Sequence, residues 1–371
     1  MTYLKAPVAG DTAPGIHILL VSVTEYFHLP GGNKRQFAYG QGFQVLDAPD
    51  HSCKALGDWF YQGKLAHPTL PIKSIDMIAS KVKLQGAAIE KPTFANVSRA
   101  INRWHDLGEL SEDNLLIFYF CGHGLMDGVT THSLLCADFG ANNNGPFDHA
   151  VYYEGLERGM RANRAKKQVF MLDICRRTDT EITNRFRGPG GDVIGRLPPA
   201  DITDVSQSVI WATSGGAQAW SRDKSPSVFA QAFIKAFDGG AATDDPTMPG
   251  VFASVASIRT ATAAWIKALG QAAQEPQVSQ PTGREFPLHR FTNVKIPVFV
   301  RCDPQNRTNG ANLSCWEQGR RLRSSKAGHP FDFWHIDLPH GTYTFKASHP
   351  LGNGQISKLV HPPLSPIFIR L

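Results

Sequence analysis

The sequence predicts an α/β protein built on a mainly parallel β-sheet with helices on both faces, followed by a small antiparallel β domain. Up to about residue 290, apolar runs of strand length alternate with helical patterns, as expected when helices join parallel strands. Beyond that point the helical period disappears, and short apolar or alternating runs are separated by Gly and Pro. We therefore expect a first domain over residues 1–292 and a β-sandwich-like domain over residues 293–371.

The individual elements follow from the hydrophobic period and from start and stop signals. In the clearest helix, apolar residues recur at intervals of three and four from Phe94 to Trp104, just after Pro92. The polar, proline-bearing segment 274–287 is typical of an inter-domain linker. Helices are predicted near residues 51–62, 93–107, 153–163, 226–237 and 255–269. Strands are predicted near residues 16–23, 74–80, 114–124, 132–138, 168–175, 208–213, 298–301, 331–336, 342–347 and 367–370.

Composition places the chain among globular proteins, with 42% hydrophobic and 19% charged residues. No window reaches the ~18 consecutive apolar residues of a membrane span, and residues 1–11 lack the apolar core of a signal peptide. We therefore expect no membrane partner. The six cysteines show no paired spacing, which indicates thiols in a reducing compartment and hence a cytoplasmic location. A bridge between Cys302 and Cys315 is the alternative.

The net charge of +6 is concentrated in the last fifth of the chain. Residues 295–371 contain 10 Lys or Arg and 4 Asp or Glu, so this segment alone accounts for +6. Its densest cluster is Arg320, Arg321, Arg323 and Lys326. This cluster is either a solvated loop or a docking patch for an acidic partner or nucleic acid. No pattern of stacking aromatic residues accompanies it, so nucleic acid is not the expected partner.

Two apolar stretches end in side chains that are typical of nucleophilic catalysis. The first, residues 114–124, leads to His123, and the second, residues 168–177, contains Cys175. Parallel strands deliver their carboxyl ends to one edge of a sheet, which is where ligands bind. An imidazole and a thiol, 52 residues apart in sequence, would meet there. The alternative is that both are ordinary strand-end residues.

The surroundings of this pair suit a cysteine peptidase. Gly124 follows His123, so its N–H group is accessible, and it could hold an oxyanion together with the N–H of Cys175. Cys121, His123 and Cys136 could instead be metal ligands, but their spacing is weak and no closing pair follows. We therefore expect no metal and no other cofactor, and leave a dependence on calcium open.

The two motifs resemble those of caspase-like peptidases, the group of caspases, paracaspases and metacaspases. Residues 119–124 read Tyr-Phe-Cys-Gly-His-Gly and residues 172–177 read Leu-Asp-Ile-Cys-Arg-Arg. The second motif is more similar to paracaspases and metacaspases, of prokaryotic type, than to the Gln-Ala-Cys-Arg-Gly of metazoan caspases. The resemblance covers roughly residues 16–290 and includes residues 212–220, similar to a segment that lines the substrate groove. It implies a caspase-hemoglobinase sheet of about six strands.

The resemblance also implies a specificity. In paracaspases and metacaspases, an acid two positions before the nucleophile lines a pocket for Arg or Lys, and Asp173 stands there. Residues two apart on a strand point the same way, so Asp173 can pair with a guanidinium beside Cys175. Alternatively, Asp173 only caps a helix or bonds backbone groups. Asp50 is the nearest second acid, although Ser52 fits the helix spacing better, and the neutral Gln218 stands where a third acid sometimes lies.

The implied function is a cysteine endopeptidase that cleaves protein substrates after Arg or Lys in a signalling or defence cascade. The glycine- and proline-bearing segment 178–201 is either a site of activating self-cleavage, with Arg185, Arg187 and Arg196 as candidates, or an uncut loop. An activating protein or upstream protease is then a further expected partner of the zymogen. Two alternatives remain: a catalytically silent scaffold that acts through the C-terminal β domain, and a cysteine hydrolase of small amides.

Overall fold

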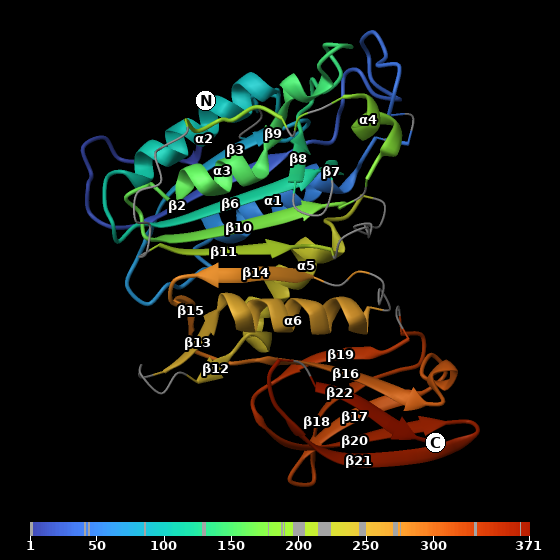
Figure 1. Ribbon diagram of the computed structural model, residues 1–371. Coiled ribbons are helices and arrows are strands. Elements are labelled where there is room, and N and C mark those ends of the chain that lie inside the picture. Colours follow the sequence, from blue (N-terminus) through green and yellow to red (C-terminus); the bar gives the residue numbers. More distant parts are fainter. Residues whose placement is uncertain are drawn as a thin grey trace. The chain divides into compact units, whose positions relative to one another are not determined.

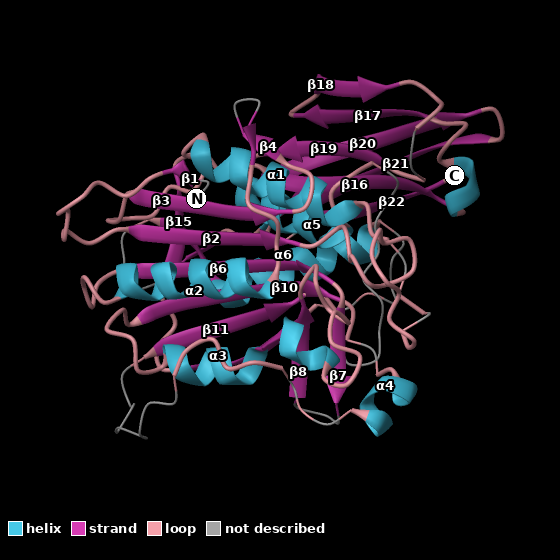
Figure 2. Cartoon of the chain, turned by 90° about the horizontal axis from the view of Figure 1, so that it is seen from above, coloured by secondary structure: helices cyan, strands magenta, loops and turns pink. Residues whose placement is uncertain are grey.

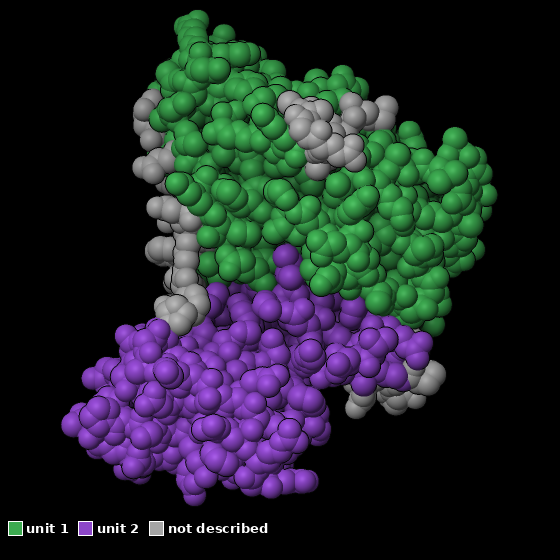
Figure 3. Space-filling view, turned by 180° about the vertical axis from the view of Figure 1, so that it is seen from behind, with its two compact units in different colours: residues 1–231, 273–286 green, residues 232–272, 287–371 purple. Residues whose placement is uncertain are grey.

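The chain forms two compact units, coloured separately in Figure 3: residues 1–231 with 273–286, and residues 232–272 with 287–371. The computed structural model describes residues 3–371 except 41, 44, 85–86, 128–130, 177, 187, 189, 196–204, 214–223, 245–249, 270–273, 275, 330–331 and 364. The second unit takes in residues 232–272 as well as the C-terminal strands, and the division after residue 292 stays a prediction. None of the described helices has the length and apolar character needed to cross a membrane.

The first unit is organised around a seven-stranded sheet (Figure 1). Its five central strands are parallel, with an antiparallel strand at each edge. The central strands are almost wholly buried, which explains their continuous apolar runs in the sequence. In spatial order the strands are β1 (Tyr3–Lys5), β3 (Ile72–Ala79), β2 (Ile16–Ser22), β6 (Leu115–Gly122), β10 (Lys167–Ile174), β11 (Ser206–Trp211) and β14 (Gln277–Thr282).

The strand β14 corrects the prediction of a linker over residues 274–287. This segment pairs antiparallel with β11 at the edge of the sheet. Its sequence is polar because an edge strand needs little apolar burial, so the usual strand signal is weak. The edge strand β1 has only three residues, too few for a periodic pattern, and was not predicted. With these two edge strands the five central strands make seven, against the expected six, because the predicted strand over residues 132–138 belongs to another sheet.

Helices cover both faces of the sheet, as Figure 1 shows with α2 and α3 in front and α1 behind. On the front face, Trp104 of α2 packs its ring against Phe118 at 5.8 Å and Phe170 at 6.0 Å. Thr93 caps α2, its hydroxyl accepting from the Asn96 N–H at 3.4 Å. The helices in the described part of the chain are α1 (Ala48–Tyr61), α2 (Phe94–Gly108), α3 (Tyr153–Met160), α4 (Thr180–Arg185), α5 (Val228–Lys235) and α6 (Val255–Ala268), with short turns η1 (Pro146–His149), η2 (Ala236–Gly240) and η3 (Gln305–Arg307). Of these, α6, η2 and η3 belong to the second unit.

A second, three-stranded sheet stands at the carboxyl ends of the central strands (Figures 1 and 2). It consists of β7 (Gly124–Asp127), β8 (Thr131–Leu135) and β9 (Ala150–Tyr152), paired antiparallel. The predicted loop 178–201 contains regular structure, because it includes the short helix α4 and because Gly191 bridges to Val151 of β9. A two-stranded hairpin joins β4 (Lys83–Leu84) and β5 (Ala87–Ala88).

The second unit contains a sandwich of two small sheets around one apolar core. Leu313 of β17 (Asn312–Glu317) and Phe345 of β20 (Gly341–His349) alternate with outward-facing polar residues and meet Val298 of β16 (Ile296–Asp303) in this core. The pairing is antiparallel as expected, except that β16 and β22 are parallel. The first sheet of the sandwich contains, in spatial order, β19 (Trp334–Leu338), β16 (Ile296–Asp303) and β22 (Ser365–Arg370). The second contains β18 (Arg320–Ser325), β17 (Asn312–Glu317), β20 (Gly341–His349) and β21 (Gly352–Val360). A further sheet is formed by β12 (Thr243–Asp244), β13 (Val251–Ser254) and β15 (Pro287–Phe291).

Candidate active site

The parallel register of β6 and β10 brings the predicted catalytic pair to neighbouring positions. Asp173 pairs with Cys121, and Ile174 pairs with Gly122 at the ends of the two strands. His123 and Cys175 are the next residue on each strand. A Cβ atom added to Gly124 would lie 2.9 Å from the Cys175 carbonyl oxygen and 2.5 Å from Ile174 Cδ1. The backbones therefore approach so closely that only glycine fits at position 124.

His123 is held by its own backbone and by two aromatic rings. Its N–H donates to the Tyr26 hydroxyl at 2.6 Å, and its carbonyl accepts from the Leu135 N–H at 3.1 Å. The imidazole centroid lies 4.8 Å from the Tyr26 ring and 4.9 Å from the Phe43 ring. Burial raises the pKa of Tyr26 well above its ordinary value, so this residue remains a neutral hydroxyl that can accept from His123.

Cys175 differs from the other cysteines in its exposure. It is half-buried, whereas the other five are buried, and none of the six forms a disulfide. Burial raises the pKa of the Cys53, Cys121 and Cys136 thiols, which keeps them protonated and unreactive. Accessibility to solvent thus singles out Cys175 as the thiol that a reagent or substrate can reach.

Asp173 is buried, with 2% of its surface exposed. Its Oδ2 atom accepts from the Tyr119 hydroxyl at 2.8 Å and from the Ser227 hydroxyl. Its Oδ1 atom has no N–H or O–H donor among the described residues. Burial raises the pKa of this carboxyl, while the hydroxyl donors and the nearby Cys121 thiol act in the opposite direction. One carboxylate oxygen is therefore anchored, and the other has unused capacity to accept a hydrogen bond.

Ser227 connects Asp173 to two helices. Its hydroxyl accepts from the Ala230 N–H at 2.9 Å, which caps the start of α5, and donates to Asp173. Its own N–H donates to the Ser52 hydroxyl of α1 at 2.8 Å. Sequence analysis missed Ser227, although a serine just before an apolar helix is a recognisable capping signal. The helix spacing in the sequence favours Ser52 over Asp50 as the residue of α1 near Asp173. Ser52 indeed contacts Asp173 indirectly, through Ser227.

Asp50 binds the ends of two strands. Its Oδ1 accepts from the Ser22 hydroxyl at 2.6 Å and from the Ser80 N–H at 3.2 Å, and its Oδ2 accepts from the Lys81 N–H at 2.7 Å. Both carboxylate oxygens already accept hydrogen bonds from the protein. Among the described residues, Asp50 makes no hydrogen bond to Asp173, Tyr119 or Ser227, so its role in a P1 pocket stays a prediction.

A second group that sequence analysis missed surrounds Arg176, the residue after the candidate nucleophile. The guanidinium lies 4.7 Å above the Trp211 ring, and its Nε atom donates to His132 Nε2 at 3.1 Å. His132 Nδ1 lies 2.5 Å from Glu154 Oε1, and Gln277 accepts from Arg176 Nη1 at 2.8 Å. In the sequence His132 has no partner pattern; the contacts arise because β8, β10, β11, α3 and β14 converge here.

The remaining residues predicted from the sequence are the P1 candidate Gln218 and the self-cleavage candidates Arg185, Arg187 and Arg196. Arg185 is exposed at the end of α4, with its guanidinium 4.8 Å from the Tyr39 ring. Gln218, Arg187 and Arg196 lie outside the described residues. Within the described part of the chain, no three His, Cys, Asp or Glu side chains are grouped as metal ligands would be.

Comparisons with known proteins indicate the family of the chain. The family model for the caspase domain matches residues 46–287, more than half of the chain. The chain is 27% identical over 241 residues to a protein of Sinorhizobium fredii (strain NBRC 101917 / NGR234) described as "Uncharacterized protein y4kE", covering 58% of this chain and 67% of that protein. A crystal structure of caspase-1 from Spodoptera frugiperda aligns with a TM-score of 0.43 and 13% identity over 75% of this chain and 90% of that one. With its parallel sheet and family match, the chain belongs to the caspase domain family.

Proposed function

We propose that this protein is a cysteine endopeptidase that cleaves polypeptides after Arg or Lys. The observation that carries the proposal is the register of β6 and β10, which makes His123 and Cys175 neighbours at the carboxyl ends of two strands. Cys175 attacks the scissile carbonyl as the thiolate, and His123 takes up the thiol proton and later protonates the leaving amine. The N–H groups of Gly124 and Cys175 hold the oxyanion.

Asp173 is the proposed recognition group for the P1 side chain. Its Oδ1 atom has no N–H or O–H donor among the described residues, while Oδ2 is anchored by Tyr119 and Ser227. A guanidinium or ammonium group that reaches Oδ1 supplies the missing donor and favours the ionised carboxylate. Because Asp173 is only 2% exposed, this pairing requires the residues that cover it to move when substrate binds. Asp50 and Gln218 are the proposed further contributors to this pocket.

Regulation forms part of the same proposal. The enzyme is made as a zymogen in the cytoplasm and is activated by cleavage between residues 178 and 201, either by another copy of itself or by an upstream protease. Arg185, at the exposed end of α4, is the described candidate among the three arginines. The protein then acts on protein substrates in a signalling or defence cascade.

The decisive experiment compares the wild type with Cys175→Ala on fluorogenic peptides that differ only at P1. We expect cleavage after Arg and Lys but not after Asp, and complete loss of cleavage in the variant. Cys302→Ala is the matched control, because it removes a buried thiol from the second unit. Cleavage that persists in Cys175→Ala would show that another residue is the nucleophile.

A catalytically silent scaffold is the second candidate, favoured by the burial of Asp173. A covalent peptide warhead with Arg at P1 separates the two functions, because labelling does not depend on turnover. Modification of Cys175 in the wild type, but not after Asp173→Asn, supports the peptidase. If the warhead fails to label protein that has been cleaved within residues 178–201, the scaffold is favoured. Preferential hydrolysis of small amides over peptides would instead indicate an amide hydrolase.

A further inference from the structure

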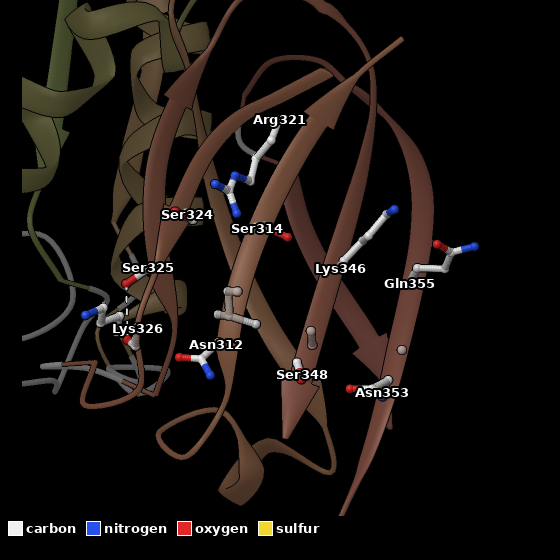
Figure 4. A pocket seen from close by; sticks show the side chains of 13 residues that line it. Asn312, Ser314, Arg321, Ser324, Ser325, Lys326, Lys346, Ser348, Asn353 and Gln355 are labelled. Atoms are coloured by element: carbon white, nitrogen blue, oxygen red, sulfur yellow. Dashed lines mark hydrogen bonds between the residues drawn. The ribbon is translucent and has the colours of Figure 1, made fainter. Parts of the chain in front are cut away.

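The second unit carries a groove of about 790 Å³ on the outer face of one of its sheets. The groove spans the four strands β18, β17, β20 and β21 and is lined entirely by residues of this unit (Figure 4). Its size falls within the range of ligand-binding pockets in proteins. It shares no residue with the candidate active site and has no role in the proposed peptidase reaction.

The alternation of residues along the strands makes this face polar. In β17, Leu313 and Cys315 are buried in the core of the unit, while Asn312 and Ser314 line the groove. Strand register then aligns polar groups across the sheet: Ser314 pairs with both Ser324 and Lys346, and Lys346 pairs with Gln355. A second row runs through Asn312, Ser348 and Asn353. The hydroxyl, amide and ammonium groups are thus arranged in rows that cross the strands, with neighbouring members of a row about 4.8 Å apart at the backbone.

The charge of the groove has one sign. Arg321, Lys326 and Lys346 line it, and the lining that the structure describes contains no Asp or Glu. Among the described residues, none of these three cations has a carboxylate within 4.0 Å. Lys346 is held over the Trp316 ring at 4.4 Å, so one charge has a defined position. The basic cluster that the sequence places at residues 320–326 therefore lies largely on strand β18, not in a solvated loop.

We propose that this groove binds an extended peptide segment with acidic side chains. The planar guanidinium of Arg321 suits a carboxylate, with which it can form two parallel hydrogen bonds. The amides of Asn312, Asn353 and Gln355 both donate and accept, as binding to a peptide backbone requires. Among the residues that the structure describes, no aromatic side chain lines the groove, so the stacking that binds single-stranded nucleic acid is missing there. Charge complementarity and hydrogen-bonding capacity thus favour an acidic peptide.

The test measures binding of a fluorescent ten-residue peptide of alternating Glu and Ser to the full-length protein. The peptide has no Arg or Lys, so the result does not depend on peptidase activity. We expect saturable binding that weakens as salt increases. The double variant Arg321→Gln, Lys346→Gln should lose affinity by at least about tenfold, because two charge-assisted contacts are removed.

The matched control is Arg320→Gln, Arg323→Gln, which removes the same charge from the same strand at exposed positions outside the groove lining. An affinity within about twofold of the wild type supports the groove as the site. An equal loss in both variants would overturn the proposal, because binding would then follow net charge alone. The proposal also fails if the peptide does not bind, or if single-stranded DNA binds more tightly and loses affinity in the groove variant. The single variant Arg321→Gln replaces the double one if the latter fails to fold, as judged by circular dichroism.

Discussion

The carbonyl oxygen of Cys175 lies 2.9 Å from the point where a Cβ atom of residue 124 would stand. Real Cβ atoms do not come this close to backbone oxygen, so any side chain at this position must displace one of the two strand ends. Gly124 is therefore a spacer that allows the segment after β6 to approach the candidate nucleophile. This close approach connects the histidine motif directly to the cysteine motif through backbone atoms. Their positions depend on tertiary structure and are not encoded in a local sequence pattern.

Replacing Gly124 with Ala should lower kcat/KM for an Arg-P1 peptide by about a hundredfold, because a displacement near 1 Å misaligns His123 and Cys175. Gly195→Ala is the control, since no atom of the described residues lies within 4 Å of its added Cβ and its φ is not in the left-handed region. Steady-state kinetics of both variants measures the effect. Equal activity in Gly124→Ala and Gly195→Ala would contradict the close approach described above.

Replacing Asp173 with Asn should abolish cleavage after Arg while raising stability at neutral pH. Burial raises the pKa of this carboxyl, so the folded state binds a proton more readily than the unfolded state. The cost of burying the charge is fully present above the raised pKa and disappears as pH falls to the ordinary pKa of about 3.9. The variant should therefore melt about 2–4 °C higher than the wild type at pH 7.5, with little difference near pH 4.

Thermal melting at the two pH values, together with the P1 profile, checks this expectation. Asn retains an oxygen that can accept from Tyr119 and Ser227, so the hydrogen bonds at Oδ2 can be preserved. A lower melting temperature of the variant at pH 7.5 would mean that the negative charge stabilises the fold. Asp173 would then have only a structural role, such as capping a helix. An unchanged P1 preference would remove it from substrate recognition.

Replacing His132 with Phe should reduce kcat by about tenfold through Arg176. The ring would still pack on Trp211, which lies 4.5 Å from the imidazole centroid, but the acceptor for Arg176 Nε would be lost. Because Arg176 follows Cys175 directly, a shift of its side chain moves the nucleophile. His132→Asn, which can still accept a hydrogen bond, is the rescue variant. The rate of Cys175 alkylation by iodoacetamide should fall with kcat in His132→Phe; a fall in stability with normal alkylation would indicate a purely structural residue.

Self-cleavage after Arg185 should depend on the stability of α4. A segment bound as an extended strand cannot keep its helical hydrogen bonds, so the last turn of the helix must open before such binding and cleavage. The Asp179 carboxylate caps α4 by accepting from the Ile182 N–H at 3.1 Å. Asp179→Ala should remove about 1 kcal/mol of helix stability and accelerate cleavage there by about fivefold. Mass spectrometry of purified protein should find these fragments in the wild type and not in Cys175→Ala. A rate unaffected by Asp179→Ala would show that opening of α4 does not limit cleavage.

The local sequence determined the central strands, most helices and the two motifs of the candidate site. Strands β2, β6 and β10 are buried on both faces. Such strands consist of continuous apolar runs, and these runs are recognisable in the sequence. The motifs at His123 and Cys175 also indicated the family before any tertiary contact was known. The sequence of the edge strand β14 predicts a linker, since a polar edge strand lacks this signal.

Only the tertiary structure decided how side chains from distant segments meet. The anchoring of Asp173 by Ser227, the contact of Arg176 with His132, and the polar groove across β18, β17, β20 and β21 all join residues from separate elements. Such contacts depend on strand register and on which helix covers which face, and no local pattern encodes them. The basic cluster after residue 320 illustrates the difference: its charge is visible in the sequence, but only strand pairing separates Arg321, which lines the groove, from its neighbours Arg320 and Arg323.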